Sequence, residues 1–122
     1  MKFRKKHYRS QMDQKDCGVA SLAMVFGYFG SYYSLARLRE LAKTTINGTT
    51  ALGLVKVAEE LGFETQAIQA DMSLFDLPDL TFPFIVHVLK EGELLHYYVV
   101  TGRDKENIHI ADPDPGIRLT KL

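Results

Sequence analysis

The sequence has one cysteine, no net charge and no long apolar run, and each shortage excludes a class of protein. A lone thiol cannot form an internal disulfide, so the chain is not a small scaffold held by disulfides. The 15 basic residues balance the 15 acidic ones, which gives no reason to expect nucleic acid or an anionic membrane as a partner. No apolar run approaches the ~18 residues that cross a bilayer, and Met1 leads into charged residues rather than a signal segment, so we expect a cytosolic domain.

Ligand-binding motifs are missing as well. There is no phosphate-binding glycine loop of the GxxxxGKS/T type, so ATP binding is not expected within the chain. No histidine pair or Cys–His spacing indicates a zinc site, and we expect no metal and no cofactor.

The order of helical and strand-like patterns predicts one α+β domain over residues 1–122, with N-terminal helices packed on a C-terminal antiparallel sheet. The first predicted helix is apolar on nearly every face, which is typical of a buried central helix. Asp16 and Gly30 are its expected caps. The predicted helices cover about 17–29, 34–43 and 51–61, and the predicted strands about 63–69, 84–90, 94–101 and 107–112.

Cys17 falls in the first turn of that central helix. Most lone cysteines are small buried hydrophobes, but a buried hydrophobe gains nothing from a helix start, whereas a nucleophile does. Free backbone N–H groups and the helix dipole favour an anion there, so we expect a thiol with a lowered pKa. Gly18 beside it is expected to let a substrate backbone come close.

A reactive thiol needs a base, and a predicted hairpin selects one. If strands 94–101 and 107–112 turn near Asp104, the numbers of opposed residues sum to about 208, so His96 faces Asp112. A carboxylate in that position fixes the imidazole tautomer and stabilises its protonated form. His109 then lies opposite Val99, with no acid beside it.

Two alternatives stay open at this point. A two-residue turn at Glu91-Gly92 would place His87 opposite His96 on the neighbouring strand, and a one-residue slip in register exchanges the faces of every strand residue. Asp114 is the alternative to Asp112, because the two adjacent prolines make the local path of the chain uncertain.

Acyl transfer also needs donors for the developing oxyanion. The backbone N–H of Cys17 is one candidate. A side-chain amide is the other, and Gln11 lies six residues upstream of the thiol. Gln14 is nearer in sequence, and distance along the chain does not decide which amide points into the site.

These residues resemble the motifs of the bacteriocin-processing cysteine peptidases. The string from Gln11 to Ala20 is similar to that family's Q-x4-D-C-G-x-A opening, and the run from His96 to Val100 to its histidine strand. Residues 111–113 resemble its acid motif, and residues 48–54 its segment before the third helix.

The resemblance implies a papain-like fold, with Cys17 as nucleophile, His96 as base, Asp112 as orienting acid and Gln11 in the oxyanion hole. It also implies the N-terminal domain of an ABC transporter, acting at the cytoplasmic face of the membrane. Such a domain cuts the leader from a peptide pheromone or bacteriocin precursor after a Gly-Gly pair, before export. The chain ends at Thr120-Lys121-Leu122, amid strand-forming sequence, and we expect the membrane and ATP-binding parts of the transporter to lie outside it.

Selectivity for two glycines predicts a channel too narrow for any Cβ, and such a channel offers little binding energy. We therefore expect the leader to dock elsewhere, as an amphipathic helix on an apolar groove. The alternative is that the groove candidates simply close the core. These candidates are Met12, Leu74, Phe75, Leu77 and Leu80.

The competing function is a docking domain that holds the leader without cutting it. Domains of that kind lack the nucleophilic cysteine, whereas Cys17 is present here in a complete motif. The expected partners in either case are the precursor peptide and the other domains of the same transporter, with no nucleic acid.

Overall fold

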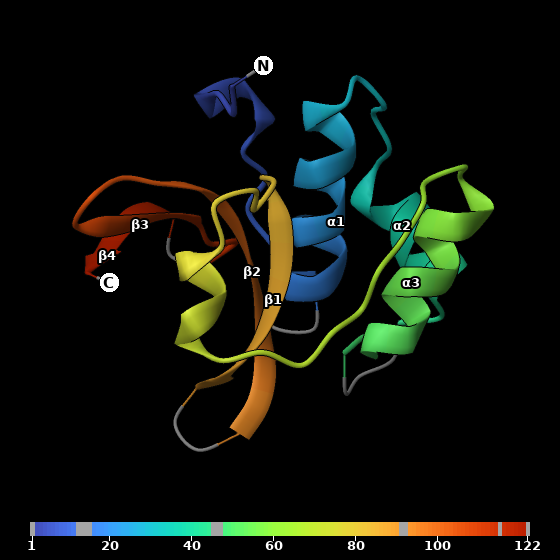
Figure 1. Cartoon of the computed structure of the whole chain (residues 1–122). Helices are drawn as coiled ribbons and strands as arrows, with labels where there is room; N and C mark the ends of the chain where they lie inside the picture. The colour runs from blue at the N-terminus through green and yellow to red at the C-terminus, as the bar shows by residue number, and fades with distance from the viewer. Residues whose placement is uncertain (1, 12–15, 45–47, 91–92, 115, 122) are drawn as a thin grey trace.

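The computed structural model describes the whole chain except residues 1, 12–15, 45–47, 91–92, 115 and 122. In the described part, α-helices lie on one face of an antiparallel sheet and a short 3₁₀ helix lies on the other (Figure 1). The predicted α+β order is confirmed. The helices are η1 (Lys5–His7), α1 (Cys17–Tyr28), α2 (Leu35–Ala42), α3 (Ala51–Glu60) and η3 (Met72–Asp76). The strands are β1 (Phe84–Lys90), β2 (Glu93–Arg103), β3 (Asn107–Ala111) and β4 (Ile117–Lys121).

The helix boundaries follow local signals in the sequence. The Ser34 hydroxyl accepts a hydrogen bond from the Arg37 N–H at 3.1 Å and so caps α2. Thr50 caps α3 in the same way through the Gly53 N–H at 3.0 Å. Gly62 follows α3 with a φ of +91°, a conformation that glycine adopts without strain.

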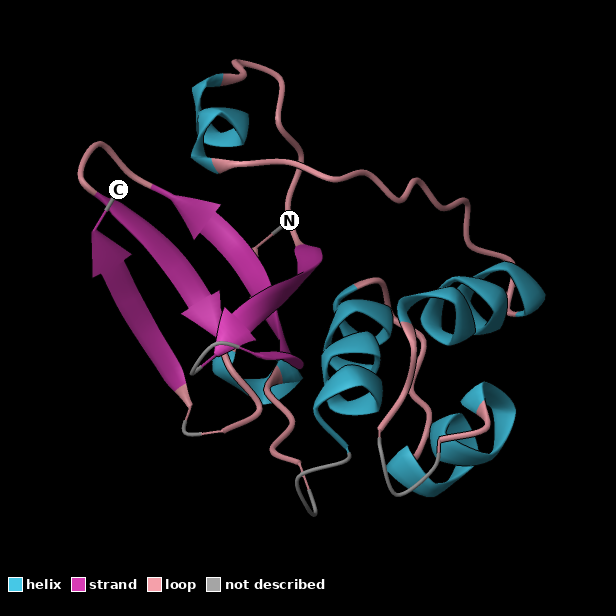
Figure 2. Ribbon diagram, turned by 90° about the horizontal axis from the view of Figure 1, so that it is seen from below, coloured by secondary structure: helices cyan, strands magenta, loops and turns pink. Residues whose placement is uncertain are grey.

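The sheet is a meander with the strand order β1-β2-β3-β4 (Figure 2). Alternate side chains of β2 pack into two separate hydrophobic clusters, one on each face of the sheet, because successive side chains of a strand point to opposite faces. Tyr97 packs with the buried face of α1, α2 and α3. Val100 packs on the other face against Phe75 of η3. Helix α1 is buried all round apart from Val25, as its uniformly apolar sequence predicts.

The strand predicted over residues 63–69 is wrong. The segment lies between α3 and η3 without a strand partner, and residues 64–71 are all exposed. Alternation alone does not make a strand, because one alternating face must be buried and the backbone must pair with a neighbour. The patterns also did not predict η1, η3 or β4. No helix in the described ranges is long and apolar enough to cross a membrane.

The predicted register of the β2–β3 hairpin is wrong by two residues. Val99 pairs with Ala111, not with His109. A shift of two residues keeps every side chain on its own face. His96 and Asp112 therefore stay on one side of the sheet, as diagonal rather than directly opposed neighbours.

The β1–β2 hairpin shows the opposite effect. Lys90 pairs with Glu93, as the predicted turn requires, but a bulge before Lys90 moves the remaining register by one residue. His87 consequently lies opposite Tyr97, so it is on the other face of the sheet from His96. The bulge rules out the predicted contact between the two histidines.

Candidate active site

Cys17 is the first residue of α1 and is buried, with 4% of its surface exposed. Asp16 precedes it, as predicted, but its side chain does not cap the helix. The Asp16 backbone is helical (φ −92°, ψ 0°) instead of extended, so the carboxylate does not reach back to the first turn. It accepts a hydrogen bond from the Arg39 Nε atom at 2.8 Å instead, which ties the start of α1 to α2.

The prediction of a lowered thiol pKa is wrong. Burial raises the pKa of Cys17, and the negative charge of Asp112 raises it further. Hydrogen bonds from the backbone N–H groups of Tyr97 and Gly18 lower the pKa without cancelling the effect of burial. The Cys17 thiol is therefore mainly protonated at neutral pH, and its reaction must be coupled to a base.

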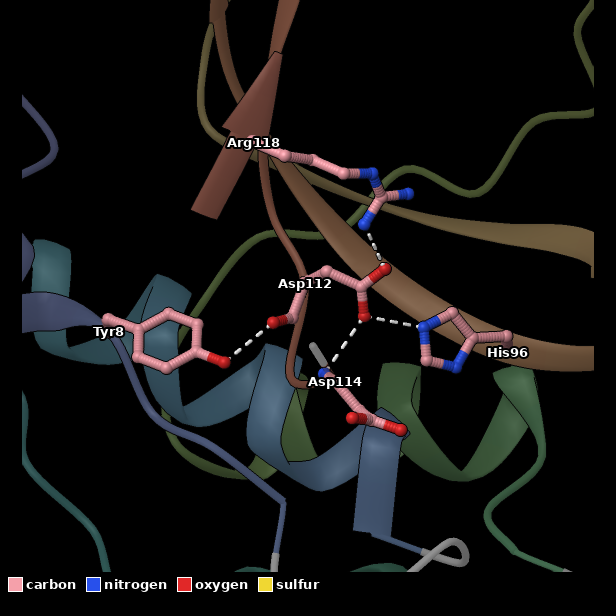
Figure 3. Close-up of polar contacts among 5 residues, drawn as sticks. All are labelled: Tyr8, His96, Asp112, Asp114 and Arg118. Atoms are coloured by element: carbon pink, nitrogen blue, oxygen red, sulfur yellow. Dashed lines mark hydrogen bonds and ion pairs between the residues drawn. The ribbon is translucent and has the colours of Figure 1, made fainter. Parts of the chain in front are cut away.

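His96 and Asp112 form a buried pair at this site (Figure 3). The His96 Nε2 atom lies 2.6 Å from Asp112 Oδ1, and the side chains of His96 and Asp112 are 10% and 2% exposed. Tyr97, which follows His96 in β2, is the residue whose backbone N–H bonds the Cys17 thiol. The thiol is therefore next to the backbone of the strand that carries His96, and the charge of Asp112 acts on it from the end of β3.

Asp112 has further partners that the sequence patterns did not indicate. Its Oδ2 atom lies 2.5 Å from Arg118 Nη1, and its main-chain oxygen accepts a hydrogen bond from the Tyr8 hydroxyl at 2.7 Å (Figure 3). The backbone N–H of Asp114 donates to Asp112 Oδ1 at 3.0 Å. Asp114 is itself exposed, so the structure places Asp112 and not Asp114 against His96.

The other histidines have separate environments. The exposed His87 ring stacks on Tyr97 with the ring centres 4.0 Å apart. His109 Nε2 lies 2.8 Å from Asp104 Oδ2 in the exposed β2–β3 turn. The His7 imidazole is buried in the N-terminal segment, where burial lowers its pKa. Of the four, His96 is the one held by a buried carboxylate.

Gln11 lies beside the Asp112 segment, because its backbone N–H donates to the Pro113 carbonyl at 3.2 Å. Its side-chain Oε1 atom is buried and has no hydrogen-bond partner among the described residues. A buried polar atom without a partner costs about 1–3 kcal/mol, so it calls for a functional explanation. Gln14, the alternative amide, lies outside the described residues.

The expected role of Gly18 needs correction. An ideal Cβ at this position would lie 3.2 Å from the Tyr97 ring, so the missing side chain makes room for Tyr97 and not for a substrate backbone. Gly18 still contributes to the site through its backbone N–H, which bonds the thiol.

The groove candidates divide between core and surface. Phe75 is buried in the core beneath β2 and β3, and Leu80 packs against the same cluster. Leu77 is 51% exposed and Leu74 is half-buried. Met12 lies outside the described residues. Residues of η3 and Arg103 line an open depression of about 360 Å³ near this surface.

No group of three or more histidine, cysteine or acidic side chains is placed to hold a metal ion in the part of the chain that the structure describes. The site contains a buried thiol, an imidazole paired with a carboxylate, and a glutamine amide whose oxygen has no partner among the described residues. That combination is the one expected for nucleophilic acyl transfer.

Residues 5–122 match the sequence model of the Peptidase C39 family. The chain belongs to the peptidase C39 family. It is therefore a cysteine peptidase domain, of the family that acts on double-glycine leaders. The family predicted from the motifs is confirmed.

Two relatives place this C39 domain within longer proteins. The transport/processing ATP-binding protein ComA of Streptococcus pneumoniae is 82% identical over 122 residues, which are 100% of this chain and 17% of ComA. The lactococcin-A transport/processing ATP-binding protein LcnC of Lactococcus lactis is 53% identical over the same share of both chains. The chain thus spans about a sixth of the length of these relatives.

Two solved structures share the C39 fold. The peptidase domain of Streptococcus ComA, a bifunctional ABC transporter involved in quorum sensing, matches with a TM-score of 0.89 and 53% identity over 93% of this chain and 85% of that one. A double-glycine motif protease from a PCAT transporter, solved with its leader peptide, matches with a TM-score of 0.82 and 29% identity over 93% and 78%. The predicted papain-like α+β fold is confirmed.

Proposed function

We propose that the chain is the N-terminal peptidase domain of a peptide exporter, and that it removes the leader of a pheromone or bacteriocin precursor after a Gly-Gly pair. The family and the processing transporters ComA and LcnC support this substrate class. The leader peptide bound to the related protease supports recognition of the leader by the domain itself. The single observation that carries the proposal is the buried His96–Asp112 contact beside the Cys17 thiol.

In the proposed reaction, Cys17 Sγ attacks the carbonyl carbon of the second glycine. His96 takes the thiol proton on Nδ1, the ring nitrogen left free by the bond from Nε2 to Asp112. Asp112 fixes the ring and stabilises the imidazolium. The raised pKa of the thiol makes this transfer necessary, because little thiolate exists before the substrate arrives.

The tetrahedral intermediate then collapses. The C–N bond breaks, His96 returns its proton to the leaving amine, and the leader remains attached to Cys17 as a thioester. A water molecule gives a proton to His96 and attacks the thioester, which releases the leader acid and restores the thiol. The Cys17 N–H at the start of α1 and the Gln11 amide stabilise the oxyanion in both steps. The bond from the Gln11 backbone N–H to the Pro113 carbonyl supports this role, because it holds Gln11 beside the Asp112 segment.

Leader affinity comes from a surface outside the reacting groups. Glycine offers no side chain to bury, so an amphipathic leader helix needs apolar contacts elsewhere. Leu77, together with Met72 at 56% exposure, offers such a surface around η3. The burial of Phe75 assigns that side chain to the core, so Phe75 supports this surface from beneath.

The domain acts at the cytoplasmic face of the membrane, where the membrane and ATP-binding parts of the transporter hold it. Its share of the ComA sequence supports this arrangement. The competing function is a docking domain that holds the leader without cutting it. The presence of Cys17, and of the buried His96–Asp112 pair whose carboxylate acts on it, favours cleavage over that function.

A peptide-cleavage assay tests the proposal. The protein is incubated with a synthetic double-glycine leader peptide, beside Cys17→Ala, and the products are identified by mass spectrometry. We expect cleavage after the second glycine by the wild type alone. An intact peptide, or cleavage at the same bond by Cys17→Ala, would refute the proposal. Binding without cleavage would instead support the docking function.

A further inference from the structure

Arg118 contacts the candidate acid from the edge of the sheet. It lies on β4, where it pairs with Ile110 of β3, and its guanidinium reaches Asp112. Its Nη1 atom lies 2.5 Å from Asp112 Oδ2, while His96 Nε2 lies 2.6 Å from Oδ1 (Figure 3). One buried carboxylate therefore binds two side chains, His96 through Oδ1 and Arg118 through Oδ2, and Oδ1 also accepts the Asp114 backbone N–H.

The position of Arg118 is fixed from a second direction. Its guanidinium carbon lies 5.4 Å from the centre of the Tyr98 ring, a cation–π contact. Tyr98 also neighbours the His96 ring, with the ring centres 6.3 Å apart. The arginine side chain is 39% exposed, whereas the Asp112 side chain is 2% exposed. A partly exposed arginine therefore binds a carboxylate that is almost completely buried. In an ordinary surface ion pair both partners would be exposed.

We propose that Arg118 is a positioning residue for the peptidase reaction: it fixes the orientation of Asp112, and its positive charge acts on the pair across that carboxylate. This inference rests on the proposed roles of His96 and Asp112. A planar guanidinium is suited to hold a carboxylate in one orientation. A fixed positive charge across the same carboxylate opposes the positive charge of an imidazolium. Arg118 thereby holds Asp112, and through it the His96 ring, in the orientation that both proton transfers use.

Other titratable groups face the pair, and all of them are retained when Arg118 alone is changed. Burial raises the pKa of Tyr8 and of Tyr98, so both stay neutral where the peptidase works. Cys17 and Asp114 also remain in place. A change in pH dependence on replacing Arg118 therefore reports the arginine charge. The facing groups are Cys17 at the start of α1, Tyr8 in the N-terminal segment, Tyr98 on β2 and Asp114 beyond β3.

The experiment compares Arg118→Met, which removes the charge, with Arg118→Lys, which keeps it. The kcat and KM for the leader peptide are measured across the acid and alkaline limbs of the pH profile. For Arg118→Met we expect kcat to fall about tenfold, the order of one lost charge-assisted hydrogen bond, with little change in KM. Both limbs should move to higher pH by ~0.5 unit, since the lost positive charge no longer opposes protonation. Arg118→Lys should keep the wild-type limbs and recover part of kcat.

Arg37→Met, which changes an exposed arginine on α2, is the matched control and should leave kcat and both limbs unchanged. If less Arg118→Met folds but the limbs of its pH profile do not move, Arg118 only stabilises the fold, and the inference is overturned. Kinetics identical to those of the wild type would overturn it as well. If Arg118→Met folds poorly, Arg118→Gln removes the same charge with a polar side chain and is judged by the same limbs.

Asp112→Asn in the same assay distinguishes a failure of the Arg118 positioning role from a failure of the proposed His96–Asp112 catalytic pair. If Asp112→Asn is slow and Arg118→Met is not, the positioning role alone fails. If Asp112→Asn is as active as the wild type, the proposed catalytic pair fails as well.

Discussion

Replacing Arg39 by methionine should destabilise the protein through a buried charge that loses its partner. Asp16 is fully buried, and both of its carboxylate oxygens accept hydrogen bonds from Arg39, at 2.8 and 3.4 Å. Removing one partner of a buried ion pair costs about 3–5 kcal/mol. The Arg39 side chain is 32% exposed, so part of this interaction is screened by water, and we expect a loss of about 2–3 kcal/mol.

The reverse change should cost less. In Asp16→Ala the arginine that remains is already one-third exposed and can be solvated, so we expect a loss of ~1 kcal/mol. The double variant should lose less than the sum of the two, because the buried charge is no longer present when Arg39 is removed. Such an asymmetry distinguishes a buried unpaired carboxylate from the loss of an ordinary surface salt bridge, which would be symmetric and small.

Urea unfolding followed by circular dichroism measures these losses, since a domain of this size is expected to unfold in one step. Arg37→Met, on the exposed side of the same helix, is the control and should change the free energy of unfolding by less than ~0.5 kcal/mol. If Arg39→Met costs no more than this control, or Asp16→Ala costs more than Arg39→Met, the reasoning from burial is refuted. Loss of the ion pair should also lower kcat, because it releases the segment that positions Cys17.

Three further predictions concern the site. Alkylation of Cys17 by iodoacetamide should accelerate with pH and inflect above the ordinary pKa of a free thiol, since burial raises its pKa; an inflection below neutrality would show a preformed thiolate and contradict this. Asp112→Asn should slow kcat by on the order of 10²–10⁴-fold with little change in leader binding, measured by calorimetry on a Cys17→Ala background, and a matching loss of binding would count against an orienting role. Leu77→Ala should raise KM severalfold with kcat nearly unchanged, whereas Leu52→Ala, at 63% exposure on α3, should not; equal effects would remove Leu77 from the leader surface.

The order of the elements and the His96–Asp112 contact of the candidate site could be predicted from the sequence, whereas the strand registers and the other contacts of Asp112 could not. Helix ends were predictable because Ser34 and Thr50 cap their helices with local hydrogen bonds. The segment 63–69 was not, because only tertiary structure decides whether an alternating stretch finds a strand partner and a buried face.

The contact between His96 and Asp112 was predicted from a register that proved wrong. It survived because the error was two residues, and an even shift keeps side chains on the same face. The error for His87 was one residue, which placed it on the opposite face. The β1–β2 difference follows the bulge at Val88–Lys90. In the β2–β3 hairpin the turn itself shifts the register, and the bulge at Val100–Gly102 changes it by one residue. Turn geometry and bulges depend on how the strands bend against each other, and residue numbers do not carry that information.

The thiol pKa shows the same limit. A position at a helix start predicts a lowered pKa, and the N–H groups that produce this effect do bond Cys17. Burial outweighs them, and burial depends on Tyr97 and the rest of the sheet closing over the start of α1. The rule for helix starts thus predicted correctly that the backbone N–H groups lower the pKa of Cys17, but it predicted the wrong direction for the total shift.

The residues missed at the site share a cause. Arg118 comes from β4 near one end of the sequence and Tyr8 from the segment near the other, and both bond Asp112. The Gln11 N–H bonds Pro113 in the same place, so the acid is enclosed by parts of the chain about a hundred residues apart. Periodicity and spacing relate neighbours in sequence and cannot reveal such a meeting. A buried carboxylate nevertheless implies it, since a charge taken out of water needs more donors than one imidazole provides. The burial of Asp112 therefore calls for a cation beside it, and Arg118 on β4 is that cation.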